Sequence, residues 1–199
     1  MTGPILVIGA TGTVGGATMR ALRAGGADAI AFVRDPQRAA QALGEDASLL
    51  VGDLGDEASV LAALDGIDGV LLCSGHDPAM RQQQLTAVRA IAASDARRVV
   101  KISGSPVSVR ADSPARTGRD HAVVEEALRA TGRETVAIRP NTFTQNFLDQ
   151  APAVAHGALP APAGEPRVSS STPAMSAAMS AASRRRRSWP NPRASPCSR

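Results

Sequence analysis

Six short apolar runs alternate with segments of helix-forming residues over most of the chain. The runs are Pro4–Ile8, Ala29–Val33, Ser48–Val51, Gly69–Cys73, Arg98–Ile102 and Thr135–Arg139. None alternates apolar with polar residues, so we expect each to be a strand buried on both faces, as in parallel sheets. The intervening segments predict helices at about 14–24, 36–43, 56–65, 79–93 and 118–131. This alternation predicts an α/β fold with a doubly wound parallel sheet.

The pattern ends well before the chain does. From about Ala151 the sequence is dominated by Ala, Pro, Gly and Ser, and Pro190, Pro192 and Pro196 oppose a late helix. We therefore expect one globular domain over residues 1–168 and a disordered tail over residues 169–199. Six arginines and no acid lie in residues 168–199, whereas the preceding part has 16 basic and 18 acidic side chains.

The composition argues against several classes of protein. A globular part without excess positive charge has no electrostatic footprint for nucleic acid. Two cysteines and three scattered histidines predict neither a disulfide framework nor a metal site. No run has the roughly 20 apolar residues of a membrane span, and the N-terminus lacks the basic segment of a signal peptide. We expect a cytoplasmic protein without membrane or nucleic-acid partners.

A glycine-rich turn follows the first expected strand and opens the first expected helix. Gly9, Gly12 and Gly15 give the spacing G-x-x-G-x-x-G, with Thr11, Thr13 and Val14 between them. The first glycine allows the sharp turn, the second lets backbone approach a pyrophosphate, and the third lets the helix pack closely. The free N–H groups of Thr13 and Val14 would then face the anion. The turn predicts dinucleotide binding of the Rossmann type, and the lack of a following Lys-Ser/Thr excludes a P-loop.

The end of the second strand bears on which dinucleotide binds. Binders of NAD(H) usually have an acid there that accepts from the ribose 2′-OH. This chain has Arg34, whose planar charged side chain suits a 2′-phosphate, and the residue after it is Asp35. We therefore expect NADP(H) to be preferred, while Asp35 leaves NAD(H) open. The alternative for Arg34 is a solvated charge at a strand end.

Four segments together resemble the NmrA-like branch of the atypical short-chain dehydrogenases/reductases. They are the glycine turn, Val33–Pro36, Gly52–Leu54 and Ala137–Leu148, and His121–Gly132 resembles that branch's helix before the sixth strand. The resemblance covers about residues 4–167. It implies that Asp53 and Leu54 border the adenine, that Ser74 and Gly75 line the nicotinamide side, and that a further C-terminal lobe closes over the substrate.

The chain departs from the superfamily at its proton-transfer residues. The superfamily's reductases use a Tyr-x-x-x-Lys pair, but this chain has no tyrosine, and Thr117 and His121 fall at those positions. Ser103 falls at the catalytic serine position. His121 and Ser103 are our candidate catalytic residues, since a histidine can carry a proton near neutral pH. The alternative for His121 is a helix-face residue in contact with solvent or the cofactor ribose.

The tail is the second departure. If residues from Ser169 onward are read from GC-rich codons in a shifted frame, the translation resembles the family's next strand and the Asp-containing segment after it. We therefore expect residues 169–199 to be an out-of-frame tail, with most of the substrate lobe missing. A natural disordered tail is the alternative.

Three functions follow from these features. The first is an NADPH-dependent oxidoreductase acting on a small quinone or carbonyl acceptor. The second is a non-catalytic dinucleotide sensor with a protein partner, and the third is an inactive truncated product. The sequence does not name the small-molecule substrate.

Overall fold

A computed structural model describes residues 3–75, 77–143 and 170–171 of the chain. Six strands alternate with five helices in the order expected from the sequence, and two very short strands follow. The elements are β1 (Ile5–Ile8), α1 (Thr13–Ala24), β2 (Ala29–Val33), α2 (Pro36–Leu43), β3 (Leu49–Val51), α3 (Glu57–Ala63), β4 (Gly69–Leu72), α4 (Met80–Ala93), β5 (Arg98–Ile102), α5 (Arg116–Ala130), β6 (Glu134–Ile138), β7 (Thr142–Phe143) and β8 (Ser170–Ser171).

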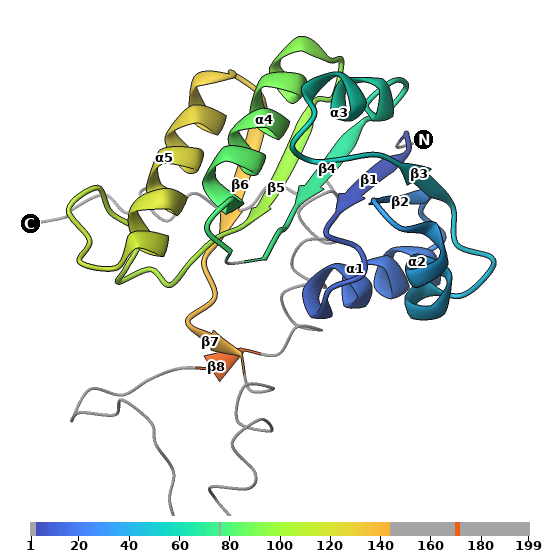
Figure 1. Ribbon diagram of the computed structural model, residues 1–199, viewed down its shortest axis with the longest axis horizontal. Helices are drawn as coiled ribbons and strands as arrows, with labels where there is room; N and C mark the ends of the chain where they lie inside the picture. The colour runs from blue at the N-terminus through green and yellow to red at the C-terminus, as the bar shows by residue number, and fades with distance from the viewer. Residues whose placement is uncertain (1–2, 76, 144–169, 172–199) are drawn as a thin grey trace, which may run out of the picture.

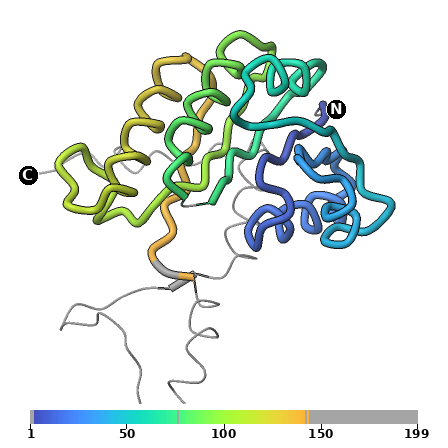
Figure 2. The backbone as a smooth tube through the Cα atoms, in the orientation of Figure 1, coloured from blue at the N-terminus to red at the C-terminus, as the bar shows by residue number. Residues whose placement is uncertain are grey.

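The first six strands form one parallel sheet of order β3-β2-β1-β4-β5-β6. Helices α1 and α2 cover one face, and α3, α4 and α5 cover the other (Figure 1). The chain trace in Figure 2 runs from the half with α1 and α2, in blue, to the half with α4 and α5, in green and yellow. This confirms the doubly wound α/β fold. The strand order reverses between β1 and β4, and such a switch point is where open α/β sheets bind ligands.

Two apolar layers hold the helices to the sheet. Leu6, Leu72 and Val99 belong to the layer that includes α4 and α5, together with Ile91 and Leu128. Alternate residues of the same strands, such as Val7 and Val100, belong to the layer beneath α1. The pleat of a strand directs successive side chains to opposite faces. The central strands are therefore buried on both faces, as their unbroken apolar runs predict.

The two edge strands differ from that expectation. In β3 Val51 is 62% exposed, and in β6 Val136 is 40% exposed, whereas β1 and β4 are buried throughout. The prediction that every run is buried on both faces is wrong for these two strands. Each of them pairs within this sheet with one neighbour instead of two.

Of residues 169–199, the structure describes Ser170 and Ser171. Ser170–Ser171 form β8, which pairs in parallel with β7. The other predictions about residues 169–199, and those about residues 144–168, lie outside the described residues. Within the described ranges, no helix combines the length and the apolar character needed to cross a bilayer.

Candidate functional site

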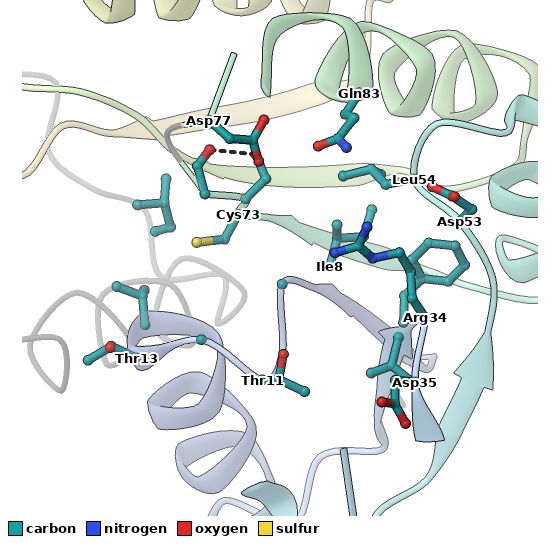
Figure 3. A pocket seen from close by; sticks show the side chains of 18 of the residues that line it. Ile8, Thr11, Thr13, Arg34, Asp35, Asp53, Leu54, Cys73, Asp77 and Gln83 are labelled. Atoms are coloured by element: carbon teal, nitrogen blue, oxygen red, sulfur yellow. Dashed lines mark hydrogen bonds between the residues drawn. The ribbon is translucent and has the colours of Figure 1, made fainter. Parts of the chain in front are cut away.

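A cavity of about 1160 Å³ lies where β1, β2, β4 and β5 end (Figure 3). It exceeds the roughly 300–1,000 Å³ of a typical small-molecule pocket. Almost every residue predicted to bind cofactor lines it: Gly9, Thr11, Gly12, Thr13, Val14, Arg34, Asp53, Leu54, Ser74 and Gly75. Ser103 and His121, the candidate catalytic residues, line it too. Gly15 is not among its lining residues.

The glycine turn has the geometry that an anion site requires. Gly9 has a φ of +78°, and a Cβ there would lie 2.1 Å from the carbonyl oxygen of Cys73. A Cβ on Gly15 would lie 2.0 Å from the carbonyl oxygen of Gly9, so this glycine lets α1 pack against the turn. Gly12 is different, because its Cβ would lie 3.4 Å from the nearest heavy atom. Its lack of a side chain therefore keeps space in the cavity open.

The N-terminus of α1 borders that open space. Gly12 is its N-cap, no side chain of the described residues caps the helix, and its first turn carries no acid. The first N–H groups of a helix have no partner inside the helix and favour an anion. The residues present therefore fit the pyrophosphate of a dinucleotide.

At the end of β2 the two charged neighbours have different roles. The Asp35 carboxylate accepts hydrogen bonds from the backbone N–H groups of Gln37 and Arg38, at 3.0 and 3.1 Å, and so caps α2. The Arg34 side chain extends into the cavity (Figure 3), and Asp35 also lines it. Arg38 also lines the cavity, so two guanidinium groups are available there. The guanidinium groups suit a phosphate, and a carboxylate such as that of Asp35 can accept from a ribose hydroxyl.

Ser74 lines the part of the cavity that lies beyond the end of β4. The buried Gln84 of α4 donates from Nε2 to Ser74 Oγ at 2.8 Å, which fixes the hydroxyl at the end of β4. Cys73, beside it, also lines the cavity, and burial raises the pKa of its thiol to about 11, with Lys101 opposing the rise. Near neutral pH Cys73 is therefore a thiol and not a nucleophilic thiolate.

Ser103, at the end of β5, belongs to a buried network of charged groups. Its Oγ donates to Glu125 Oε1 at 2.6 Å, and Arg139 donates to the same carboxylate at 3.0 and 2.5 Å. Burial opposes ionisation of Glu125, but the hydrogen bonds from Arg139 and Ser103 outweigh it and hold the pKa of the carboxyl below its usual range. An ionised carboxylate only accepts hydrogen bonds. The single hydroxyl proton of Ser103 is therefore directed at Glu125.

His121 lies on α5 and is only 3% exposed. Its Nδ1 lies 2.8 Å from Nζ of Lys101, which is fully buried in β5 and also donates to the carbonyl of Ile102 at 3.2 Å. The ring fits beside Gly104, where a Cβ would lie 2.9 Å from His121 Cδ2. The histidine is thus buried against a cation instead of lying on a solvated helix face.

Sequence reasoning missed several of these groups. Arg38 could have been found, because a helix that starts directly after Asp35 carries its third residue back toward the strand end. Lys101 lies inside the apolar run Arg98–Ile102, and a lysine in a buried strand signals a paired charge. Glu125 and Arg139 come together only through the packing of α5 against β6.

A parallel sheet of this order, with a cavity at the switch point beside a glycine turn, defines a dinucleotide-binding α/β protein. The sequence matches the family described as NAD(P)H-binding over residues 9–177, which is most of the chain. This protein belongs to that NAD(P)H-binding family, and the resemblance to the NmrA-like branch is confirmed.

Two named relatives and one solved structure are similar to this chain. The chain is 29% identical to the NAD(P)H azoreductase of Xenophilus azovorans over 83% of this chain and 57% of the relative. It is also 29% identical to quinone oxidoreductase 2 of Escherichia coli, over 89% of this chain and 62% of the relative. The solved structure of an NADPH-dependent quinone oxidoreductase from Escherichia coli, complexed with NADPH, superposes with a TM-score of 0.79 at 26% identity, covering 89% of this chain and 63% of that one. The chain thus spans about three fifths of these relatives' length.

Proposed function

We propose that this protein is an oxidoreductase that uses NADPH to reduce a small quinone or another carbonyl compound. The observation that carries the proposal is the composition of the cavity along its length. Arg34 lies directly after β2 and Arg38 in the first turn of α2, the N-terminus of α1 lies in the middle, and the buried Lys101–His121 pair lies near the end of β5. These features suit, in turn, a ribose phosphate, a pyrophosphate and a reacting carbonyl group.

The choice of NADP(H) over NAD(H) rests on Arg34, Arg38 and Asp35. The Asp35 carboxylate already accepts the two hydrogen bonds of the α2 cap through Oδ1, so it offers only Oδ2 to a ribose hydroxyl. Arg34 and Arg38 would instead bind the 2′-phosphate through charge-assisted hydrogen bonds. Asp53 and Leu54 border the adenine in this proposal, while Ser74 and Gly75 line the nicotinamide side.

When bound, NADPH supplies a hydride, which is the difficult part of the chemistry. The protein's residues have to orient the acceptor and provide the proton that its oxygen gains. His121 is our candidate for this role, because it lines the cavity and the hydroxyl proton of Ser103 is directed at Glu125, although His121 Nε2 is buried in this structure. Ser103 and Glu125 then fix the shape and charge of the wall beside the acceptor.

Acceptor-dependent oxidation of NADPH tests this function. The purified chain is mixed with NADPH or NADH and with a panel of quinones, azo compounds and simple carbonyls, and the loss of reduced cofactor is followed by absorbance. The proposal expects oxidation with at least one quinone or carbonyl, faster with NADPH than with NADH. Tight binding of NADPH without oxidation by any acceptor would instead favour a dinucleotide sensor.

A further inference from the structure

Gln84 is a fully buried glutamine of α4, on the same helix face as Val88 and Ile91 of the apolar layer that includes α4 and α5. Its Nε2 donates to Ser74 Oγ at 2.8 Å, whereas its Oε1 is buried without a hydrogen-bond partner among the residues that the structure describes. A buried polar group without a partner destabilises a fold. Stability therefore does not explain the glutamine, and its contact with Ser74 is the role to account for.

Ser74 follows β4 directly, is half-buried and lines the cavity. A hydroxyl has one proton to donate and two lone pairs to accept with. The N–H of Gln84 occupies one lone pair and leaves the proton uncommitted. Within the described ranges, the acceptor for that proton is the carbonyl oxygen of Gly75 at 3.4 Å, which is long against the usual distance of about 2.7–2.8 Å. A ligand in the cavity would offer a better acceptor.

The neighbouring strand end shows why this hydroxyl differs from that of Ser103. In the register of β4 and β5 Leu72 lies opposite Lys101, and two residues further along Ser74 comes opposite Ser103. Both serines line the cavity. The proton of Ser103 is directed at the Glu125 carboxylate, whereas Ser74 has an amide N–H as its side-chain partner. Of these two hydroxyls, Ser74 is the one that can donate to a ligand.

We propose that Gln84 fixes Ser74 as the hydrogen-bond donor for a carbonyl oxygen seated against the end of β4. Two groups carry such an oxygen, namely the carboxamide of the nicotinamide and the acceptor that is reduced. The proposal rests on the function proposed above, which brings both groups to this cavity. Ser74 contacts the ligand, and Gln84 is a positioning residue that acts through Ser74.

The first arm of the test is calorimetry with NADPH and with 2′-phospho-ADP-ribose, which lacks the nicotinamide. A hydrogen bond between neutral groups contributes about three- to tenfold in affinity. If the carbonyl is that of the carboxamide, Ser74→Ala and Gln84→Met should each weaken NADPH binding by about that factor. Their binding of 2′-phospho-ADP-ribose should equal that of the wild type, because this ligand has no carboxamide.

The second arm covers the other source of the carbonyl. If NADPH affinity is unchanged in both variants, the oxygen belongs to the acceptor. Ser74→Ala and Gln84→Met should then raise KM or lower kcat for a quinone or carbonyl acceptor by about three- to tenfold.

Two further measurements separate positioning from packing. The double variant Ser74→Ala/Gln84→Met should lose no more than Ser74→Ala alone, because Gln84 acts through the hydroxyl. Gln84→Met should resist urea at least as well as the wild type, since it removes a buried carbonyl that has no described partner. The control is Gln82→Met, which changes an exposed glutamine of the same helix and should leave NADPH affinity unchanged.

Unchanged NADPH affinity in folded Ser74→Ala, with unchanged acceptor kinetics or with no acceptor reduced, would overturn the proposal. Losses that add in the double variant would overturn the role of Gln84, as would lower urea resistance of Gln84→Met with wild-type binding. NADPH binding that weakens as expected in a chain that reduces no acceptor would overturn the oxidoreductase function and leave this proposal standing. A wild-type chain that does not bind NADPH would overturn both.

Discussion

The buried lysine makes a prediction about stability that needs no cofactor. Lys101 is fully buried in the native state, and burial lowers the pKa of its ammonium to about 8, against an ordinary value of 10.5. In the unfolded chain the pKa returns to that ordinary value. Between these two pH values the unfolded chain binds one more proton than the folded protein. The free energy of unfolding of the wild type should therefore gain a contribution that rises with pH in this window.

The size of this contribution follows from the pH range between the folded and unfolded pKa values of Lys101. Each pKa unit corresponds to about 1.4 kcal/mol, and the contribution of Lys101 grows mainly above its folded pKa of about 8, so from pH 7 to pH 9 it should rise by about 1.3 kcal/mol. Lys101→Met lacks the titrating group. The difference in unfolding free energy, wild type minus Lys101→Met, should accordingly become more positive by that amount. The Cys73 thiol, whose pKa burial raises to about 11, is common to both proteins and largely cancels.

Urea unfolding followed by circular dichroism at pH 7 and pH 9 measures this difference. The same comparison with Arg97→Met is the control, since that exposed guanidinium stays charged in both states. A difference between wild type and Lys101→Met that is the same at both pH values would show that the lysine is not desolvated as the structure implies. A difference that decreases as pH rises would show that folding raises the pKa of Lys101 instead of lowering it.

Two further predictions concern the arginines. Arg139→Met should lower the free energy of unfolding by about 3–5 kcal/mol in urea, because it leaves the 4%-exposed Glu125 carboxylate without its closest cation. Arg129→Met removes a mostly exposed guanidinium 3.8 Å from the same carboxylate and should cost no more than about 1 kcal/mol; equal losses in the two variants would refute this assignment. Arg34→Gln should weaken NADPH binding by roughly tenfold or more and leave NADH binding nearly unchanged, since a charge-assisted hydrogen bond contributes about 1.5–3 kcal/mol. Calorimetry with both dinucleotides checks this, and an unchanged ratio of affinities would remove Arg34 from the phosphate site.

Much of the fold could be predicted from the sequence because local signals and tertiary structure agree. The apolar run Ala29–Val33 is β2, and residues 36–43 are α2, with Pro36 in its first turn and Asp35 as its cap. The edge strands could not be predicted as such, because the apolar runs of β3 and β6 resemble those of the central strands. Whether a strand has one neighbour or two depends on sheet order, which a single run does not encode.

The candidate site also has one part that the sequence predicts and one part that it does not. The dinucleotide half is readable from sequence, because the glycine spacing and the strand ends fix which backbone and side chains meet there. The half near β5 depends on contacts between distant elements. Glu125 meets Ser103 and Arg139, and His121 meets Lys101, only when α5 packs on the sheet. The superfamily's motif positions pointed to Ser103 and His121, but no motif pointed to Lys101, Glu125 or Arg139 as their partners.

The central claim, that the glycine turn holds the pyrophosphate of NADPH, is tested most directly by calorimetry on one glycine variant and its matched control. Gly12 has a φ of −83°, and its Cβ would lie 3.4 Å from the nearest heavy atom, so Gly12→Val should fold while it fills the anion site. Gly25, at the other end of α1, has a φ of −85° and the same 3.4 Å clearance, so Gly25→Val controls for the substitution itself. We predict that wild type and Gly25→Val bind NADPH alike and that folded Gly12→Val shows no binding. A folded Gly12→Val with wild-type affinity would contradict the account.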